Sequence, residues 1–301
     1  MEVSVIIVSY NVKEFLFQCI TSLLKFSEAG RLEIIVVDNN SEDGSVEMVR
    51  THFPKARLIV NSSNAGFPVA NNQALKIATG EFIYLLNPDT ESIMDSIAVL
   101  KRYLELHADV DLVAPQLLNS DRSIQHSISR FPKIRYLIAE MFYFDRFNKR
   151  KYYLEKDPDE QIEIDAAFGA ALFFRKTLLN KIGMLNEKLF WIEDIDYCYR
   201  IKQAGGKILY LPEAKLVHHS GQSAKKNYTV SVSNQVINKI KFYKVHHNSG
   251  ELLIVYLLSI TNALMRLVVF TLLSPFSKIY FLKMKAYWLT IPKLFTATGG
   301  L

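Results

Sequence analysis

The chain has 301 residues, of which 50% are hydrophobic, 22% are charged and only 21 are Gly or Pro, a composition that excludes disordered, collagen-like and low-complexity proteins. The length suffices for one large α/β domain plus an appendage, or for two modest domains. The net charge of +6 is uneven, because residues 1–214 hold 25 Lys and Arg against 29 Asp and Glu, whereas residues 215–301 hold 11 against a single acid, Glu251. A basic, apolar chain end points to an anionic membrane surface before it points to nucleic acid.

The first 115 residues alternate short β-branched runs with helical patterns. This rhythm is typical of a parallel, doubly wound α/β sheet, in which ligands bind beyond the carboxyl ends of the strands. We expect strands at residues 3–8, 33–37, 57–60, 81–86 and 112–114, and helices at 14–26, from a cap near Ser41, at 68–78 and at 93–107.

The alternation stops in residues 116–163, where aromatic and basic side chains mix between residues 131 and 153. Such a segment is either a loop-and-helix insertion with a solvated basic face or a surface that binds an anionic or lipid-linked acceptor. Regular patterns then resume, with strands expected at 166–174, 207–211 and 215–217 and a helix at 193–203 that Gly205 and Gly206 end.

Two features bear on the compartment. Cys19 and Cys198 lie far apart without CxxC spacing, which indicates neither a disulfide framework nor a zinc site and fits a reducing environment. Residues 1–9 run directly into a strand pattern, with Glu2 where a signal peptide carries positive charge. We therefore expect the catalytic part to stay in the cytosol.

Polar residues follow the first two expected strands. Ser9, Tyr10 and Asn11 (VSYN) come after the first, and Asp38 (VVDNNSEDGS) ends the second, where a carboxylate can accept hydrogen bonds from a base or ribose. The chain lacks both GxGxxG and GxxxxGK[ST]. A nucleotide would therefore bind without a glycine-rich loop.

Asp89 (LLNPDT) follows the fourth expected strand directly after a proline. A carboxylate there suits a hard divalent cation that takes its other ligands from water and substrate phosphate. It equally suits the N-cap of the helix expected from Ile93. Two histidines, His218 and His219, follow the last expected strand, where an imidazole either completes a metal site or is structural.

Three acids, Glu193, Asp194 and Asp196, stand at the start of the helix in FWIEDIDYCYR. The helix dipole accounts for one or two of them. Phe190 and Trp191 would flank a carboxylate in a partly apolar cleft, which raises its pKa and makes it a useful general base. Glu193 and Asp194 point roughly 100° apart on a helix, so only one of them faces the cleft.

Seven motifs in this order resemble glycosyltransferase family 2 with the GT-A fold, and within it the bacterial rhamnosyltransferase-like branch: VSYN, VVDNNSEDGS, NAGFPVANN, LLNPDT, GAALFFR, WIEDIDYCYR and HHSGQS. The resemblance covers residues 3–247 and leaves residues 248–301 as an apolar and basic helical tail. It implies a mostly parallel central sheet flanked by helices. It also implies inverting transfer from a nucleotide-diphosphate sugar, dTDP-rhamnose or another dTDP- or UDP-sugar, with Mg²⁺ or Mn²⁺. Because residues 215–301 are apolar and basic, we expect the acceptor to be a lipid-linked saccharide in cell-surface polysaccharide synthesis.

The resemblance also assigns roles. It makes Asp194 the catalytic base and gives the metal to Asp89 and His218; His218 fits the HxxGxS spacing to Gly221 and Ser223 better than His219 does. Arg200 would support its helix or the diphosphate. The residues implied for the nucleotide and donor are Ser9, Tyr10, Asn11, Asp38, Asn40, Asn64, Gly66, Asn71, Asn87 and Arg200. Those implied for the acceptor and sugar are Gly169, Ala170, Trp191 and Glu193.

The sequence departs from the family pattern at Pro68, where Ala is frequent, and at residues 184–187, where a GFDE-like turn is usual. Three other functions fit the sequence less well. A nucleotidyltransferase would carry a Gly-rich loop with Arg or Lys after the first strand, which VSYN lacks. A catalytically silent nucleotide-sugar-binding scaffold is disfavoured by the candidate donor, metal and base positions, and a nucleic-acid-binding module by the acidic first 214 residues.

Residues 252–273 are long enough to span a bilayer but carry Arg266, with Ser259 and Asn262 on the same side of the helix. That stripe suits a helix in the membrane interface or one whose polar edge packs on protein. The alternative is a buried helix of a C-terminal cap or of a homo-oligomer interface. Lysines beside Tyr and Trp in residues 278–288 favour peripheral or monotopic attachment, through residues 250–291, to the cytoplasmic face of the inner membrane.

Overall fold

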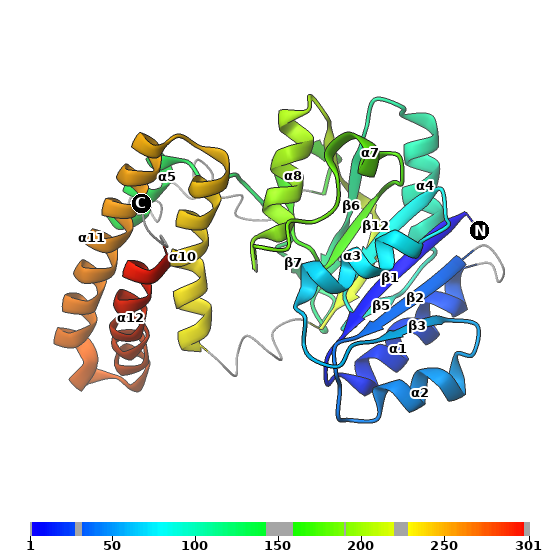
Figure 1. Ribbon diagram of the computed structural model, residues 1–301, viewed down its shortest axis with the longest axis horizontal. Helices are drawn as coiled ribbons and strands as arrows, with labels where there is room; N and C mark the ends of the chain where they lie inside the picture. The colour runs from blue at the N-terminus through cyan, green and yellow to red at the C-terminus, as the bar shows by residue number, and fades with distance from the viewer. Residues whose placement is uncertain (1, 28–31, 143–158, 190, 220–227, 298–301) are drawn as a thin grey trace. The chain divides into compact units, whose positions relative to one another are not determined.

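The computed structural model describes residues 2–27, 32–142, 159–189, 191–219 and 228–297 (Figure 1). Two compact units divide the chain. The first comprises Met1–Phe131 with Glu155–Ser220, and the second comprises Pro132–Leu154 with Gly221–Leu301. Helix α10 (Tyr228–His246), which the sequence analysis counted with the first domain, groups with the C-terminal helices because it packs against them.

The first unit is built on a central sheet whose N-terminal half is parallel, in the order β3-β2-β1-β4. The strands are β1 (Val3–Ser9), β2 (Leu32–Asp38), β3 (Arg57–Val60) and β4 (Phe82–Leu86), and the helices between them are α1 (Lys13–Phe26), α2 (Ser45–His52) and α3 (Phe67–Ile77). Every side chain of β1 and β4 is buried, as expected for parallel strands covered on both faces. This half confirms the predicted βα rhythm.

The other half of the sheet is mixed. β11 (Ala171–Arg175) runs antiparallel to both β4 and β6 (Leu112–Leu118), while β12 (Ile208–His218) is parallel to β6. The remaining strands of this sheet are short: β5 (Thr90–Ser92) pairs with β12, β7 (Ile124–Gln125) with β6, and β9 (Ile162–Glu163) with β12. A separate two-stranded sheet is formed by β8 (Ile128–Ser129) and β10 (Ala166–Ala167).

Two predicted strand boundaries were wrong. The strand expected at 166–174 is broken into β10 and β11 by residues 168–170. The two strands expected at 207–217 are one strand, β12, whose register shifts between Leu211 and Lys215. In both places a local irregularity re-aims the chain beside the carboxyl edge of the sheet.

Two predicted helix starts were also wrong. The helix expected from Ser41 begins at Ser45, because the Ser41 backbone N–H donates to Asp38 and Asn40 adopts a left-handed φ of 69°. The helix expected from Ile93 is α4 (Ser96–Leu106), whose N-terminus is capped by Asp95 through the Ala98 N–H. Asp89 is therefore not the cap of that helix.

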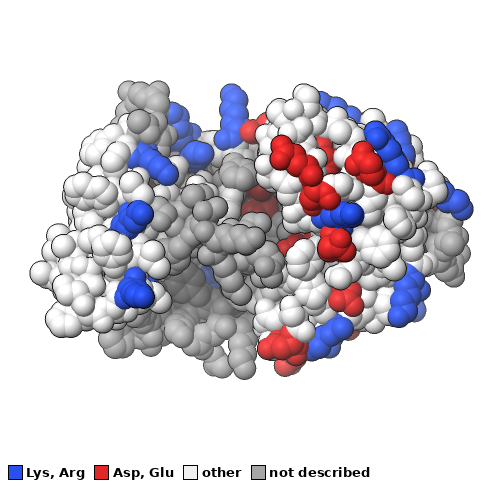
Figure 2. All heavy atoms as spheres, turned by 90° about the horizontal axis from the view of Figure 1, so that it is seen from below, with Lys and Arg blue, Asp and Glu red and all other residues white. Residues whose placement is uncertain are grey.

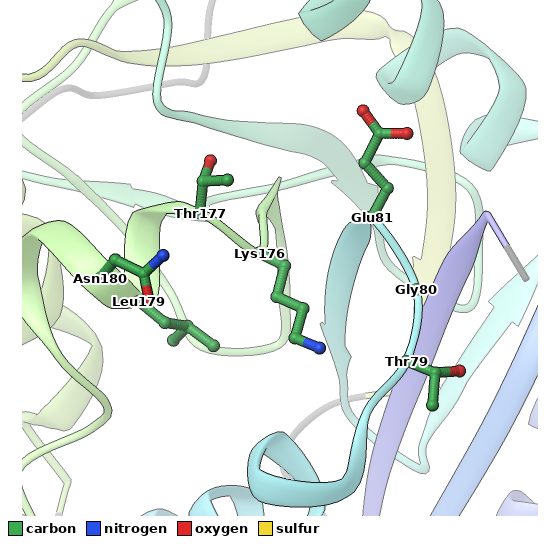
Figure 3. Close-up of a pocket in the computed structure, with 7 residues that line it drawn as sticks. All are labelled: Thr79, Gly80, Glu81, Lys176, Thr177, Leu179 and Asn180. Carbon is green, nitrogen blue, oxygen red and sulfur yellow. The ribbon is translucent and has the colours of Figure 1, made fainter.

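A pocket of about 400 Å³ opens at the amino end of β4 (Figure 3). Its lining includes Gly80, Glu81 and Lys176, and the Lys176 Nζ donates to the Ala78 carbonyl at 2.7 Å. The polar residues singled out in the sequence follow the opposite, carboxyl end of β4. This pocket is thus separate from the candidate site.

The second unit is helical. It contains α5 (Ile134–Met141), α10, α11 (Ser249–Leu273), a short 3₁₀ turn at Ser274–Phe276 and α12 (Lys278–Ala297), and in Figure 1 helices α10, α11 and α12 lie side by side. Among the residues that the structure describes, one helical stretch, Ser249–Phe276, has the length and apolar composition to cross a membrane.

Candidate active site

Two buried polar atoms without a hydrogen-bond partner in the described part of the chain lie at the ends of β1 and β2. Ser9 and Asp38 are neighbours in the parallel register and are almost fully buried. One carboxylate oxygen of Asp38 accepts from the Ser41 N–H at 2.8 Å, but its other oxygen and the Ser9 hydroxyl have no hydrogen-bond partner among the described residues. Because buried polar atoms without partners are costly, these two suit hydrogen-bonding groups of a ligand.

The loops that follow these two strands are tied to each other. Asn11, with a φ of 53°, donates its N–H to the Ser41 Oγ, and its side-chain oxygen accepts from the Glu42 N–H. Asn40 is likewise left-handed. Tyr10 directly precedes Asn11, whose hydrogen bonds hold this loop in place. Its ring is 48% exposed and can contact a ligand.

The segment before α3 lies against the same frame. Gly66, with a φ of 85°, donates its N–H to the Asn64 side chain, and its carbonyl accepts from the Asn39 side chain. Asn71 behaves differently: it is 1% exposed and donates to the Phe67 carbonyl within its own helix. The donor-binding role implied for Asn71 stays a prediction.

The end of β4 meets the end of β12. The pairing of β12 with β5 sets His218 opposite Thr90, and this places the His218 Nε2 3.2 Å from an Asp89 carboxylate oxygen. His219 turns elsewhere, with its Nε2 3.3 Å from Glu91 and its Nδ1 2.9 Å from the Ser120 hydroxyl. Of the two histidines, His218 is the one beside Asp89. Gly221 and Ser223 lie outside the described residues.

A divalent cation is compatible with this pair. Within the described ranges no three His, Cys, Asp or Glu side chains gather as a metal-binding group. A carboxylate with one imidazole fits a cation that keeps water and takes its remaining ligands from a diphosphate, as Mg²⁺ does. Asp89 and His218 are the residues that would hold it.

Asp194 is held in place at the start of α8 (Glu193–Gln203). One carboxylate oxygen accepts from the Gly169 N–H at 2.8 Å and the other from the Ile195 N–H at 2.7 Å. Burial raises the pKa of the Asp194 carboxyl. The carboxylate is thus oriented by the backbone and retains a proton more readily than an exposed aspartate, which suits a general base.

Glu193 lies next to it and is buried. Burial, and after it the negative charge of Asp194, raises the pKa of Glu193 to about 7. Its carboxylate accepts from the Ile192 N–H, while Trp191, with a left-handed φ of 71°, is 42% exposed. The contact with a sugar that the resemblance implies for Trp191 stays a prediction, and Phe190 lies outside the described residues.

The break between β10 and β11 brings the base close to the end of β4. The Gly169 N–H binds Asp194, and the Ala170 carbonyl accepts from the Asn87 N–H at 2.9 Å. A Cβ added at Gly169 would lie 3.4 Å from the Asp194 Cβ. Gly169 and Ala170, expected to line the acceptor, thus lie between the candidate base and the β4 end that leads to Asp89.

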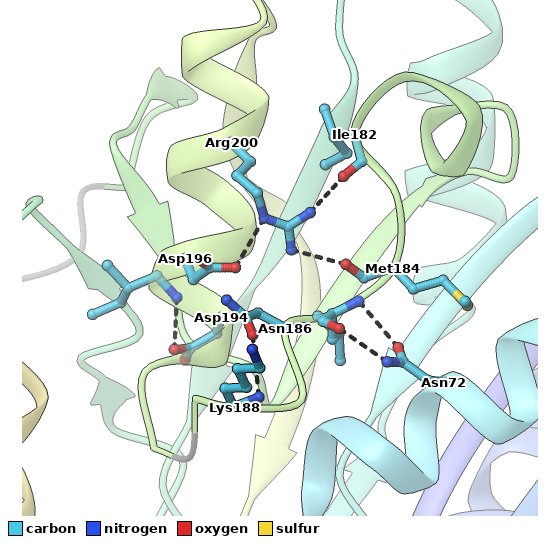
Figure 4. Close-up of polar contacts among 10 residues, drawn as sticks. Asn72, Ile182, Met184, Asn186, Lys188, Asp194, Asp196 and Arg200 are labelled. Atoms are coloured by element: carbon cyan, nitrogen blue, oxygen red, sulfur yellow. Dashed lines mark hydrogen bonds and ion pairs between the residues drawn. The ribbon is translucent and has the colours of Figure 1, made fainter. Parts of the chain in front are cut away.

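The guanidinium of Arg200 makes three hydrogen bonds within the protein (Figure 4). Its guanidinium pairs with Asp196 at 2.9 Å and donates to the carbonyls of Ile182 and Met184. Of the two roles implied for Arg200, these contacts match support of the helix and not a free diphosphate ligand. The donor-binding role stays a prediction.

Sequence reasoning missed Asn72. Its side-chain nitrogen donates to the Leu185 carbonyl and its oxygen accepts from the Leu185 N–H (Figure 4). The nitrogen also donates to Glu187. These bonds pin residues 185–187, where the sequence departs from the family pattern, onto α3. The motif NAGFPVANN ends in two asparagines and could have pointed to Asn72, but only Asn71 was chosen as a candidate.

The chain is similar to known glycosyltransferases. The chain is 22% identical over 235 residues to the N-acetylglucosaminyl-diphospho-decaprenol L-rhamnosyltransferase of Mycobacterium tuberculosis, covering 73% of this chain and 76% of that protein. It is 29% identical over 209 residues to the Staphylococcus aureus poly(ribitol-phosphate) beta-N-acetylglucosaminyltransferase TarS, covering 64% of this chain and 35% of TarS. A Sinorhizobium fredii relative, "Uncharacterized protein y4gI", is 26% identical over 235 residues, which are 73% of this chain. This chain spans only 25% of the length of that relative.

Solved structures and a family model complete the comparison. The mannosyltransferase PcManGT from Pyrobaculum calidifontis, solved with GDP-Man and Mn²⁺, superposes with a TM-score of 0.59 at 17% identity, covering 97% of this chain and 86% of that one. At this identity the likeness shows the fold alone, and that fold is GT-A. The family model described as "Glycosyl transferase family 2" matches residues 4–183. Since this match spans more than half of the chain, the protein belongs to glycosyl transferase family 2.

Proposed function

We propose that this chain is an inverting glycosyltransferase that moves a sugar from a nucleotide-diphosphate donor to a saccharide hydroxyl in cell-surface polysaccharide synthesis. The observation that carries the proposal is the unpartnered, buried pair of Ser9 and Asp38 at the carboxyl ends of β1 and β2. Sites at this edge receive ligands in α/β sheets, and the Asp89–His218 pair follows β4 and β12 at their own carboxyl ends.

The donor is proposed to be dTDP-rhamnose or another dTDP- or UDP-sugar. The rhamnosyltransferase and N-acetylglucosaminyltransferase names of the relatives support this class. Ser9 and Asp38 would receive the base or ribose, and Tyr10 would pack on it. The other donor residues are proposed to be Asn11, Asn40, Asn64, Gly66, Asn71 and Asn87.

The residues divide the chemistry between them. Mg²⁺ or Mn²⁺ held by Asp89 and His218 would neutralise the charge of the leaving diphosphate. Asp194 removes the proton from the acceptor hydroxyl. The hydroxyl oxygen then bonds to the anomeric carbon from the face opposite the diphosphate, and the bond between that carbon and the diphosphate breaks. One displacement inverts the anomeric centre. Gly169, Ala170, Trp191 and Glu193 would line the acceptor and sugar beside Asp194.

The acceptor is proposed to be polyprenyl-linked, with the enzyme attached to the cytoplasmic face of the inner membrane through residues 250–291. The decaprenol-linked substrate in the name of the mycobacterial relative supports a lipid carrier. The charge of the chain end supports the attachment, since residues 215–301 carry a single acid against 11 basic residues.

A thermal-shift screen of nucleotide sugars, with and without Mn²⁺, tests the proposal. A ligand at 100 times its Kd stabilises the native state by about 2.7 kcal/mol, so a dTDP- or UDP-sugar should raise the Tm clearly. The Asp38→Asn variant should lose most of this shift, whereas the exposed Leu106→Glu variant should keep it. A binder that neither transfers nor hydrolyses its nucleotide sugar would instead be a scaffold, and release of pyrophosphate from a nucleoside triphosphate would indicate a nucleotidyltransferase.

A further inference from the structure

Helix α11 exposes a row of large apolar side chains, while Ser259, Asn262 and Arg266 are buried or half-buried. Ser259 is 4% exposed, and Arg266 donates to the Asn262 side chain and to the Glu140 carbonyl of α5. At helical spacing the exposed side chains fall on one face of roughly 160°. Its large residues, each between 39% and 69% exposed, are Leu253, Ile254, Leu257, Leu264, Met265, Val268, Val269 and Leu272. We call them the α11 apolar face.

Helix α12 packs against α11 and carries a different surface. Lys278, Lys285 and Lys293 are exposed along its length, together with Trp288 at 66%. Lys and Arg side chains stand among uncharged ones over these helices in Figure 2. Lysines interleaved with aromatic rings are typical of the headgroup layer of a bilayer.

The surfaces of α11 and α12 distinguish a helix α11 that crosses a membrane from one that lies along the membrane surface. If α11 crossed the bilayer, α12 would run through it as well, and Lys285 would lie near the centre, where a charged side chain is costly. If α11 lies flat, its apolar face reaches the acyl chains along its whole length, while the lysines of α12 remain near the phosphates.

We infer that α11 lies parallel to an anionic lipid bilayer with the α11 apolar face inserted, and that α12 contacts the headgroups. The inference deepens the membrane attachment proposed above and is independent of the transfer chemistry. The partner is a lipid surface and not a second copy of the chain, because the basic excess of residues 215–301 is complementary to anionic lipid and would repel an identical copy.

Flotation of the full chain with vesicles of phosphatidylcholine and phosphatidylglycerol tests the partner. Leu264→Glu should lower vesicle partitioning about tenfold or more, while Leu106→Glu, an equally large change at an exposed leucine of α4, should leave it unchanged. Equal partitioning of the two variants overturns the inference. So does a wild-type oligomer without vesicles that Leu264→Glu converts to monomer. Transfer to a water-soluble acceptor reports separately on the proposed function.

Spin labels on vesicle-bound protein test the orientation. Cysteines introduced singly at Leu257, Leu264 and Leu272 should report one common depth when α11 lies flat. Leu257 and Leu272 are about 22 Å apart along the helix, so a spanning helix would give depths that differ by most of that length. Unequal depths, or labels that stay in water, overturn the inference.

A second inference rests on a separate observation, the contacts of Gln125. Its side-chain nitrogen donates to the His218 carbonyl at 3.0 Å and to the Asn119 side-chain oxygen at 3.0 Å. With both donors used on oxygens, its own oxygen faces the His218 Nδ1 at 2.6 Å and accepts the Nδ1 proton. In the neutral ring this leaves the lone pair on Nε2, which points at Asp89.

We infer that Gln125 is a positioning residue that fixes the ring orientation and tautomer of His218, so that Nε2 is the metal ligand. The inference rests on the metal site of the proposed function. An outer partner on the second ring nitrogen is the usual device that orients a ligating histidine, and its loss typically weakens metal binding 10- to 100-fold.

Mn²⁺ affinity, measured by EPR on the full chain with UDP present, tests the role without relying on turnover. Gln125→Leu should weaken Mn²⁺ binding about tenfold or more, and Gln125→Glu, which still accepts the Nδ1 proton, should recover most of the affinity. Ser120→Ala is the matched control, because it removes the Nδ1 partner of His219 instead. Equal affinities for Gln125→Leu and Ser120→Ala overturn the inference, whereas a wild-type chain that binds no Mn²⁺ overturns the metal site itself.

Discussion

Replacing Asp194 by Asn is expected to lower kcat for sugar transfer by about 10³-fold and to leave donor affinity within a factor of about two, because general-base catalysis contributes roughly 10²- to 10⁴-fold. The residue is oriented by two backbone N–H groups and has a raised pKa, so its proton-accepting role depends on the carboxylate alone. Release of the nucleoside diphosphate measures the rate, and calorimetry measures donor binding.

The control must separate chemistry from structure. An Asn at this position turns its NH₂ group toward the N–H of Gly169 or of Ile195, which could displace the loop. Asp194→Ala assayed with added formate avoids this conflict, since a small carboxylate can restore a missing proton acceptor but not a missing structural contact. Near wild-type turnover in Asp194→Asn, or no response of Asp194→Ala to formate at any concentration, would count against the base assignment.

The raised pKa values of Asp194 and Glu193 predict that, as the pH rises, the transfer rate increases while the stability of the fold decreases. Transfer by the proposed mechanism needs the ionised Asp194 carboxylate, whose pKa is raised by burial, so kcat/KM should fall as the pH is lowered, and the fall should begin at a higher pH than for an exposed aspartate. For stability, the pKa of Glu193 is raised from 4.5 to about 7, so its contribution is fully present below about pH 4.5 and is lost as the pH rises through 7. Urea unfolding across this window should show the decline in wild type and a smaller one in Glu193→Gln.

Replacing Arg200 by Ala is expected to lower the free energy of unfolding by about 3 to 5 kcal/mol, because it removes the guanidinium that pairs with the fully buried Asp196 carboxylate. The same change removes the donors to the carbonyls of Ile182 and Met184. Denaturant unfolding measures the loss. Arg50, an exposed residue paired with Glu47 on α2, gives the matched control, since Arg50→Ala should cost less than about 1 kcal/mol.

Two further variants identify the cause. Arg200→Lys keeps the charge but not the fork that reaches both carbonyls, so it should fall between wild type and Arg200→Ala. Adding Asp196→Asn to Arg200→Ala should recover part of the lost stability, because the buried charge is then absent. An Arg200→Ala chain as stable as Arg50→Ala would show that the pair does not support the fold.

The strand and helix pattern of the first unit could be predicted because it depends on local periodicity. β1 to β4 and α8 follow from runs of buried side chains and from acids at a helix start. The direction of β11 could not be predicted. Its antiparallel pairing with β4 and β6 depends on tertiary packing and not on the residues of β11 themselves. The start of α4 was misplaced because several residues near it are good caps, and only the structure shows that Asp95 is used.

The site divides in the same way. Asp38, Asp89 and Asp194 could be predicted because they follow strands or begin a helix next to them, where chemistry is expected. Gln125 and Asn72 could not, because the groups they bind lie 93 and 113 residues away in the chain. The pairing of β12 with β5, not spacing along the chain, selects His218 over His219.

The break between β10 and β11 limits how this enzyme can be altered. The same three residues present Gly169 to Asp194 and Ala170 to Asn87, so a substitution that reshapes the loop shifts the base and the end of β4 together. If Gly169 and Ala170 line the acceptor and Asp194 is the base, as proposed, a change of acceptor preference made in this loop is expected to carry a loss of rate. Under the proposed roles, Trp191, whose ring is 42% exposed just before α8, is a second position at which acceptor preference could be altered.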